Sequence, residues 1–191
     1  MILVGDFMRD LYIDCDGVIF NTIKPAFKEM KEMGIDLNNQ DAITEYFKNC
    51  DWHKLIHTGG QINNSIEKIK QLADSNVFNT VNVATHRCSY IEGVVKTEIF
   101  NELIPNVKII TIPKRLGKHF ALPANNHILI DDAKSKVIDW IKHGGIGVLF
   151  SEDVNRLIYP QEFNNDYFII NDLLDVIKVN DYYKEKTYKK L

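Results

Sequence analysis

Residues Leu11–Val18 read LYIDCDGV, a short apolar run followed by two acidic residues and a glycine. This pattern is typical of a buried strand that ends at a sharp turn, because glycine lets the chain turn away. Alternate residues of an extended chain point the same way, so Asp14 and Asp16 share one side. Two carboxylates this close repel each other, so the pair indicates a hard metal ion or a nucleophile beside a general acid and base. An ordinary Asp-Gly turn after a strand is the alternative.

A second acidic pair follows another apolar run, where Ile128–Ile130 precedes Asp131 and Asp132. In an open parallel sheet all carboxyl ends of the strands lie along one edge, and ligands bind where the strand order reverses. We therefore expect the two acidic pairs to converge on one site. Between them in the chain, the strand-like stretch Thr80–Ala84 ends in Thr85, whose hydroxyl can hold a phosphate oxygen.

Basic residues lie between that stretch and the second acidic pair, at Lys114-Arg115 and Lys118-His119. Carboxylates, a hydroxyl and an ammonium group together are what magnesium-assisted phosphoryl transfer through an aspartyl phosphate requires. The residue types therefore favour a phosphate-ester chemistry at this sheet edge.

The whole chain alternates strand-like runs with helical periodicity, which predicts an α/β fold, a Rossmann-like doubly wound parallel sheet. The segment from Ile23 to about Gly60 breaks this alternation and reads as helices with aromatic residues. We expect strands near residues 11–14, 81–84, 107–111, 128–130 and 147–150, an edge strand at 167–170 and a closing helix from Asp172.

These motifs occur in the order found in the haloacid dehalogenase (HAD) superfamily of phosphatases, which the chain resembles. The first two motifs match Asp14–Val18 and Val81–Thr85, the third is a lysine, and the fourth matches Ile128–Asp132. The fourth motif, together with the glycine-rich stretch Gly144–Phe150, looks most like the 5'(3')-deoxyribonucleotidase branch. The matches span most of the chain.

The resemblance implies a role for each acidic residue. Asp14 is expected to be the nucleophile that attacks phosphorus, and Asp16 the acid that protonates the leaving oxygen and then activates water. Asp132, helped by Asp131, is expected to hold Mg²⁺ together with Asp14 and the backbone carbonyl of Asp16.

The resemblance also implies that Thr85 and a lysine hold the phosphoryl group and neutralise its charge. His86, next to Thr85, is a further candidate for contact with the phosphate. We prefer Lys118 for this lysine, because it follows Gly117 and lies closer to the fourth motif. Lys114 is the alternative. Either lysine can equally be an ordinary surface residue, and His86 an ordinary loop residue.

An insertion after the first strand forms a small helical cap in this superfamily. The resemblance therefore implies a catalytic core of residues 1–22 and 61–191 and a cap of residues 23–60. Phe20, Phe47 and Trp52 are the candidates for stacking on a base or excluding water from the pocket. The alternative is that these rings form the core of the cap itself.

The composition of the chain is that of an ordinary globular enzyme. It has 191 residues, of which 45% are hydrophobic, and a net charge of −3, which implies no general nucleic-acid binding. No apolar run approaches the roughly 18 residues of a membrane span. Three cysteines fit a reducing cytoplasm better than a disulfide framework. Cys50, His53 and His57 have a spacing that can bind zinc, but a fourth ligand is missing.

The residue types and the resemblance together predict a Mg²⁺-dependent phosphomonoesterase, and the resemblance implies a 5'-nucleotidase acting on (deoxy)ribonucleoside monophosphates. The alternatives are a phosphatase for another small metabolite such as a sugar phosphate, one for a nucleic-acid end, or a non-catalytic binding or regulatory protein of the same fold. The acidic residues Asp14, Asp16 and Asp132 argue against a pure binder, which has no need of an acid/base carboxylate. The expected partner is a small phosphate ester, and a homodimer stays open.

Overall fold

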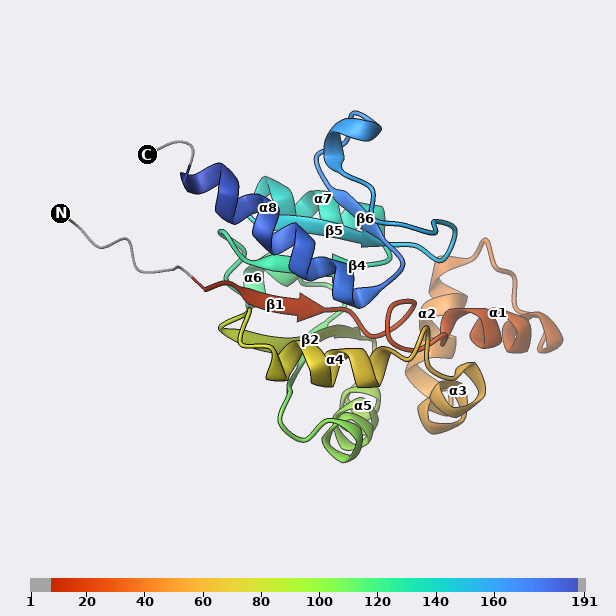
Figure 1. The fold of residues 1–191 in the computed structure, drawn as a ribbon. Coiled ribbons are helices and arrows are strands. Elements are labelled where there is room, and N and C mark those ends of the chain that lie inside the picture. Colours follow the sequence, from red (N-terminus) through yellow and green to blue (C-terminus); the bar gives the residue numbers. More distant parts are fainter. Residues whose placement is uncertain (1–7, 189–191) are drawn as a thin grey trace.

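The computed structural model describes residues 8–188, and at its centre is a six-stranded sheet in which all neighbouring strands are parallel (Figure 1). The strand order is β3-β2-β1-β4-β5-β6, so the order reverses beside β1, between β1 and β4. The strands are β1 (Asp10–Ile13), β2 (Thr80–Arg87), β3 (Lys108–Pro113), β4 (Ile128–Asp131), β5 (Ile146–Phe150) and β6 (Phe168–Ile170).

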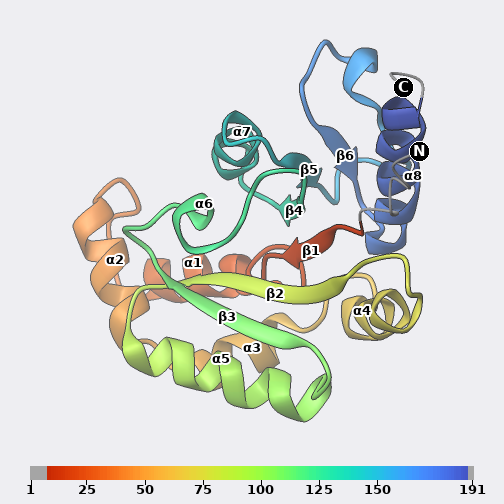
Figure 2. The same ribbon diagram turned by 90° about the vertical axis from the view of Figure 1, so that its left-hand side faces the viewer.

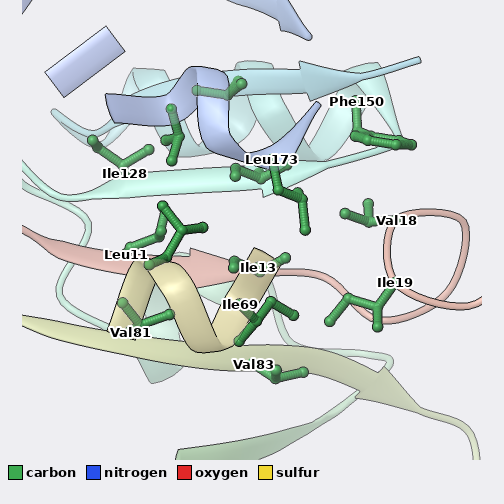
Figure 3. Close-up of a cluster of buried hydrophobic side chains, with 14 of the residues drawn as sticks. Leu11, Ile13, Val18, Ile19, Ile69, Val81, Val83, Ile128, Phe150 and Leu173 are labelled. Carbon is green, nitrogen blue, oxygen red and sulfur yellow. The ribbon is translucent and has the colours of Figure 1, made fainter. Parts of the chain in front are cut away.

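The apolar residues of β1 account for its central place in the sheet. Leu11 lies in register with Val81 of β2 and Ile128 of β4, and all three side chains are buried. Figure 3 shows how these residues gather with Ile13 and Ile69 in one continuous core. Burial of this kind stabilises the fold by roughly 1.5–3 kcal/mol per large apolar side chain.

Helices cover both faces of the sheet (Figure 2). The helices α4 (Ser65–Asp74), α5 (Tyr90–Leu103) and α8 (Val176–Tyr188) pack on the core that contains Leu11. On the opposite face lie α6 (Lys118–Ala121) and α7 (Lys134–Lys142). Trp140 of α7, with Leu122 and Ala124 from the segment after α6, packs in a smaller core there. Two short 3-10 turns flank β6 in the chain, η1 (Pro160–Glu162) before it and η2 (Leu173–Asp175) after it.

Three helices follow β1 and lie beyond its carboxyl end, at the right of Figure 1: α1 (Ile23–Glu32), α2 (Gln40–Asn49) and α3 (Trp52–Gly59). The two chain segments that connect them to the sheet run side by side, since the Asn21 amide donates to the Gly60 carbonyl at 3.1 Å. The three helices share an apolar cluster that also includes Val95 of α5, namely Ala26, Met30, Ile43, Tyr46, Phe47, Trp52 and Leu55.

The predicted doubly wound α/β fold and the helical segment after the first strand are confirmed. The second strand is longer than predicted, because Thr85–Arg87 continue the pairing with β3 rather than ending it. Among residues 8–188, none of the helices is long and apolar enough to cross a membrane.

Candidate active site

The two acidic motifs meet at the carboxyl edge of the sheet, as the parallel topology requires. Asp14 follows β1 directly, and Asp131 is the last residue of the neighbouring β4. Between Asp16 and Val18 the chain turns through Gly17, whose φ of 79° favours glycine. A Cβ atom at Gly17 would collide with the Asp132 carboxylate, so glycine also makes room for the second acidic motif.

Three carboxylates form a cluster at this edge. One oxygen each from Asp14, Asp131 and Asp132 lies within 4.8 Å of the other two. Oxygen ligands in this number and spacing suit Mg²⁺, which binds through one or two carboxylates plus water and substrate phosphate oxygens. The donor set therefore fits the ion that the sequence implies.

Lys118 is the lysine that the fold brings to Asp14. Its Nζ lies 3.0 Å from Asp14 Oδ1 and 2.7 Å from Asp131 Oδ2, and its side chain is only 2% exposed. Lys114 is exposed on the rim of the adjoining cavity and has no such pairing among the described residues.

A second lysine at the cluster, Lys136, was not anticipated from the sequence. Its Nζ lies 3.2 Å from Asp14 Oδ2 and 3.4 Å from Asp131 Oδ1. Burial opposes ionisation of Asp14, but the ammonium groups of Lys118 and Lys136 outweigh it and lower the pKa of Asp14 well below its usual value. The only sequence signal for Lys136 was its place in the first turn of the helix after the fourth motif.

Asp16 lines the same cavity as Asp14 but is not a member of the three-carboxylate cluster. Its Oδ1 accepts a hydrogen bond from Thr22 Oγ1 at 2.7 Å, and its Oδ2 lies 2.5 Å from Lys96 Nζ. Lys96 is fully buried and also pairs with Glu92 at 2.7 Å. Although burial opposes its charge, these carboxylates, Asp16 foremost, raise the pKa of Lys96. Sequence reasoning missed Lys96, whose only signal was its spacing of four residues from Glu92 on one helix.

The two candidate phosphate ligands on β2 differ in their surroundings. Thr85 is fully buried, and its Oγ1 donates to the His86 carbonyl at 3.2 Å and lies 3.3 Å from Lys96 Nζ. His86 lines the cavity beside Asp14, and its Nε2 lies 2.9 Å from the Leu116 carbonyl. Burial lowers the pKa of His86, so the neutral ring donates from Nε2 to this carbonyl.

A cavity of about 570 Å³ opens above these groups, between the sheet edge and the helices that follow β1. Phe47 and Trp52 line it with their rings stacked, at 5.7 Å between centroids and 24° between planes. Both rings also belong to the apolar cluster of α1–α3, so they are core and pocket residues at once. The cavity is further lined by Asp14, Asp16, Ile23, His86, Cys88, Glu92, Lys114, Leu116, Gly117, Asp132, Ser135, Lys136 and Asp139.

Two other candidates lie elsewhere. Phe20 packs against Phe100 in the main core, at 5.5 Å between ring centroids, and is not among the described residues that line the cavity. Within the described part of the chain, Cys50, His53 and His57 do not form a cluster with metal-ligand spacing.

The chain resembles known proteins in its structure but not detectably in its sequence. No protein-family model matches the chain, and no curated protein matches its sequence. The HAD-hydrolase YfnB from Bacillus subtilis, solved bound to magnesium, matches in fold with a TM-score of 0.58, 16% identity and coverage of 91% of this chain and 99% of that one.

Two further solved structures agree with this match. A hydrolase from Pseudomonas syringae has a TM-score of 0.56, 17% identity and coverage of 91% of this chain and 98% of that one. A haloacid dehalogenase-like hydrolase from Bacteroides fragilis has a TM-score of 0.54, 12% identity and coverage of 87% and 98%. The chain therefore has the fold of HAD-superfamily hydrolases over nearly its whole length.

The structure predicts that Mg²⁺ binding at the carboxylate cluster depends on pH. Desolvation of the carboxylate, and then the negative charges of Asp14 and Asp131, raise the pKa of Asp132 to about 7. Below that pH Asp132 holds a proton that a metal ion must displace. We expect the affinity for Mg²⁺, measured by calorimetric titration, to rise about tenfold between pH 6 and pH 8.

The matched variant for this experiment is Asp132→Asn, which keeps the size of the side chain and removes the titrating group. We expect it to bind Mg²⁺ more weakly than the wild-type protein and with little dependence on pH. A wild-type affinity that stays constant from pH 6 to pH 8 would contradict the assignment.

Proposed function

We propose that the protein is a Mg²⁺-dependent phosphomonoesterase that works through an aspartyl phosphate on Asp14. The observation that carries this proposal is the surroundings of Asp14, which lies between two lysine ammonium groups, beside two further carboxylates, on the wall of a cavity. These lysines keep Asp14 ionised, as a nucleophile requires. The same ammonium groups lie where a phosphate ester would need compensating charge.

In the first half of the proposed reaction, a carboxylate oxygen of Asp14 attacks phosphorus and the bond from phosphorus to the ester oxygen breaks. Asp16 enters this step protonated and gives its proton to the departing oxygen, so the leaving group departs as an alcohol. The Asp16 carboxylate that remains is the form that pairs with the Lys96 ammonium. In the second half, Asp16 takes a proton from water, and the hydroxide attacks phosphorus. The bond between phosphorus and Asp14 then breaks, which releases phosphate and restores the Asp14 carboxylate and the protonated Asp16.

The remaining groups position these two carboxylates and balance charge. Lys96 and Thr22 hold the Asp16 carboxylate away from Asp14, so the two do not compete for one position. Lys118 and Lys136 would face the phosphate oxygens from the Asp14 side. Mg²⁺, held by Asp14, Asp132 and the Asp16 carbonyl with Asp131 nearby, would supply further positive charge to the phosphate oxygens.

Within this proposal, we infer that the substrate is a small phosphate ester, foremost a nucleoside monophosphate, and that residues 23–60 act as a cap over the cavity. A volume of about 570 Å³ is in the usual range for small-molecule sites. The stacked pair Phe47 and Trp52 offers an aromatic surface on the wall of a charged site, which favours a base over a sugar phosphate.

The direct test is phosphate release from a panel of nucleoside monophosphates and sugar phosphates, with Mg²⁺ and after complete chelation. We expect hydrolysis with Mg²⁺ and none after chelation, restored by adding the ion back. Activity that survives chelation would overturn the mechanism, and a preference for sugar phosphates would overturn the nucleotidase assignment alone.

Phe47 gives the cleaner test of base stacking, because Trp52 also lies under the Lys96 ammonium, 4.2 Å from Nζ to the ring centroid. If Phe47 contacts the base, Phe47→Ala removes a contact worth about 1–3 kcal/mol. We expect kcat/KM for a nucleotide to fall by about fivefold to 150-fold, and hydrolysis of p-nitrophenyl phosphate to fall much less.

The matched control is Leu55→Ala, a buried residue of the same apolar cluster that does not line the cavity. It should lower the melting temperature and affect both substrates equally. If Phe47→Ala behaves like Leu55→Ala, the ring serves only the core of α1–α3.

A further inference from the structure

A second group of metal-binding residue types lies between α6 and α7. His119 is on α6, Asp139 is on α7, and His143 is the first residue after α7. One donor atom from each lies within 4.8 Å of the other two. These residues take no part in the proposed hydrolysis.

The carboxylate of Asp139 pairs with both imidazole rings. Its Oδ2 lies 2.6 Å from His119 Nδ1, and its Oδ1 lies 3.9 Å from His143 Nδ1. The two imidazoles stack face to face, with 3.6 Å between centroids and 6° between planes. Asp139 and His143 are four residues apart, which places their side chains on one side of α7.

His119 is the fixed member of the group. Its side chain is only 8% exposed, and its Nε2 is buried without a hydrogen-bond partner among the described residues. Since no described protein group bonds to Nε2, the neutral ring can carry its proton on Nε2. In that tautomer the lone pair of Nδ1 is available to bind a metal ion. Gly117 makes this packing possible, since a Cβ there would come within 2.6 Å of the His119 ring.

The other two residues are accessible and adjustable. Asp139 is 44% and His143 is 45% exposed, so an ion can reach the group from solvent and keep water ligands. The polar contacts described for the His143 ring are both with Asp139. Nδ1 donates a hydrogen bond to the Asp139 backbone carbonyl at 2.8 Å, and it lies 3.9 Å from the Asp139 carboxylate. The ring can therefore turn out of the stack to bring its nitrogen toward an ion held by the other two residues.

We propose that His119, Asp139 and His143 form a binding site for a divalent transition-metal ion such as Zn²⁺. Two imidazole nitrogens and one carboxylate oxygen, with positions left for water, are a common zinc ligand set. Mg²⁺ prefers oxygen ligands, so the two sites select different ions by the chemistry of their donors. The proposal does not depend on the phosphatase reaction.

A bound ion would join α6 to α7 beside the active site. Lys118, which pairs with Asp14, precedes His119 in the chain, and Asp139 itself lines the cavity. Ion binding at this position would restrain the segment that carries Lys118 and add positive charge at the rim of the cavity.

The test is a calorimetric titration of the metal-free protein with ZnCl₂ in excess Mg²⁺, so that the carboxylate cluster is already occupied. We expect one Zn²⁺ per chain. His143→Ala and Asp139→Asn should each weaken binding by at least about tenfold, and both residues are exposed enough for the variants to fold. His57→Ala, which alters an exposed histidine elsewhere, should bind like the wild-type protein.

Titration with Co²⁺ identifies the ligands independently. Binding through nitrogen and oxygen gives visible absorption without the strong near-ultraviolet band of a cobalt thiolate, and we expect this spectrum to be lost in His143→Ala. The proposal is overturned if the wild-type protein binds no Zn²⁺, if both variants bind it as tightly as the wild type, or if a thiolate band shows that cysteines hold the ion.

Discussion

Asp14→Asn is expected to abolish phosphate-ester hydrolysis while the protein remains folded. An amide oxygen is a poor nucleophile toward phosphorus, so no covalent intermediate can form, and we expect kcat to fall by at least about a thousandfold. The side chain keeps its size at a fully buried position, so packing around it is preserved. Phosphate release under saturating Mg²⁺, together with a melting curve, measures both effects.

The matched control is Asp16→Asn, which removes the acid and base but leaves the nucleophile. Here we expect turnover to be lost as well, while a phosphorylated protein forms slowly and accumulates, detectable by mass spectrometry after acid quench. Normal turnover in Asp14→Asn would refute the assignment of Asp14 as the nucleophile. Absence of phosphoprotein in both variants would contradict only the assignment of Asp16 as the acid and base.

Lys118→Met is expected to cause the largest combined loss of activity and stability. Lys118 is buried and pairs with Asp14 at 3.0 Å and with Asp131 at 2.7 Å. Its removal leaves two buried carboxylates short of a positive charge, and breaking a buried pair in this way costs about 3–5 kcal/mol. We expect a marked drop in the free energy of unfolding, measured by urea denaturation, and loss of phosphate release.

Lys114→Met is the matched control for this variant, because it makes the same change at an exposed lysine on the rim of the same cavity. We expect its free energy of unfolding to change by no more than about 0.5 kcal/mol. Mg²⁺ should restore part of the stability of Lys118→Met, since the ion supplies positive charge to the same carboxylates. The assignment fails if Lys114→Met is the variant that loses activity.

Local patterns in the sequence were sufficient for the fold and for the acidic half of the site. Strand-like runs such as Leu11–Ile13 and Ile128–Ile130 can be recognised from their own residues, and parallel pairing then brings their carboxyl ends together. Asp14, Asp131 and Asp132 follow these runs directly, so their convergence follows from the topology. The helices inserted after β1 were equally visible, because they interrupt a regular alternation.

The basic half of the site depended on the tertiary structure. Lys96 and Lys136 come from helices whose rotation about their own axes decides which side chains face the sheet edge, and only packing sets that rotation. Lys118 was preferred from the sequence, but its burial against Asp14, while Lys114 remains at the surface, is again a result of packing. Phe20 was expected in the pocket, but it packs in the main core because its ring meets Phe100 of α5. Contacts between segments far apart in the chain have no local signature in sequence, so only the folded chain determines them.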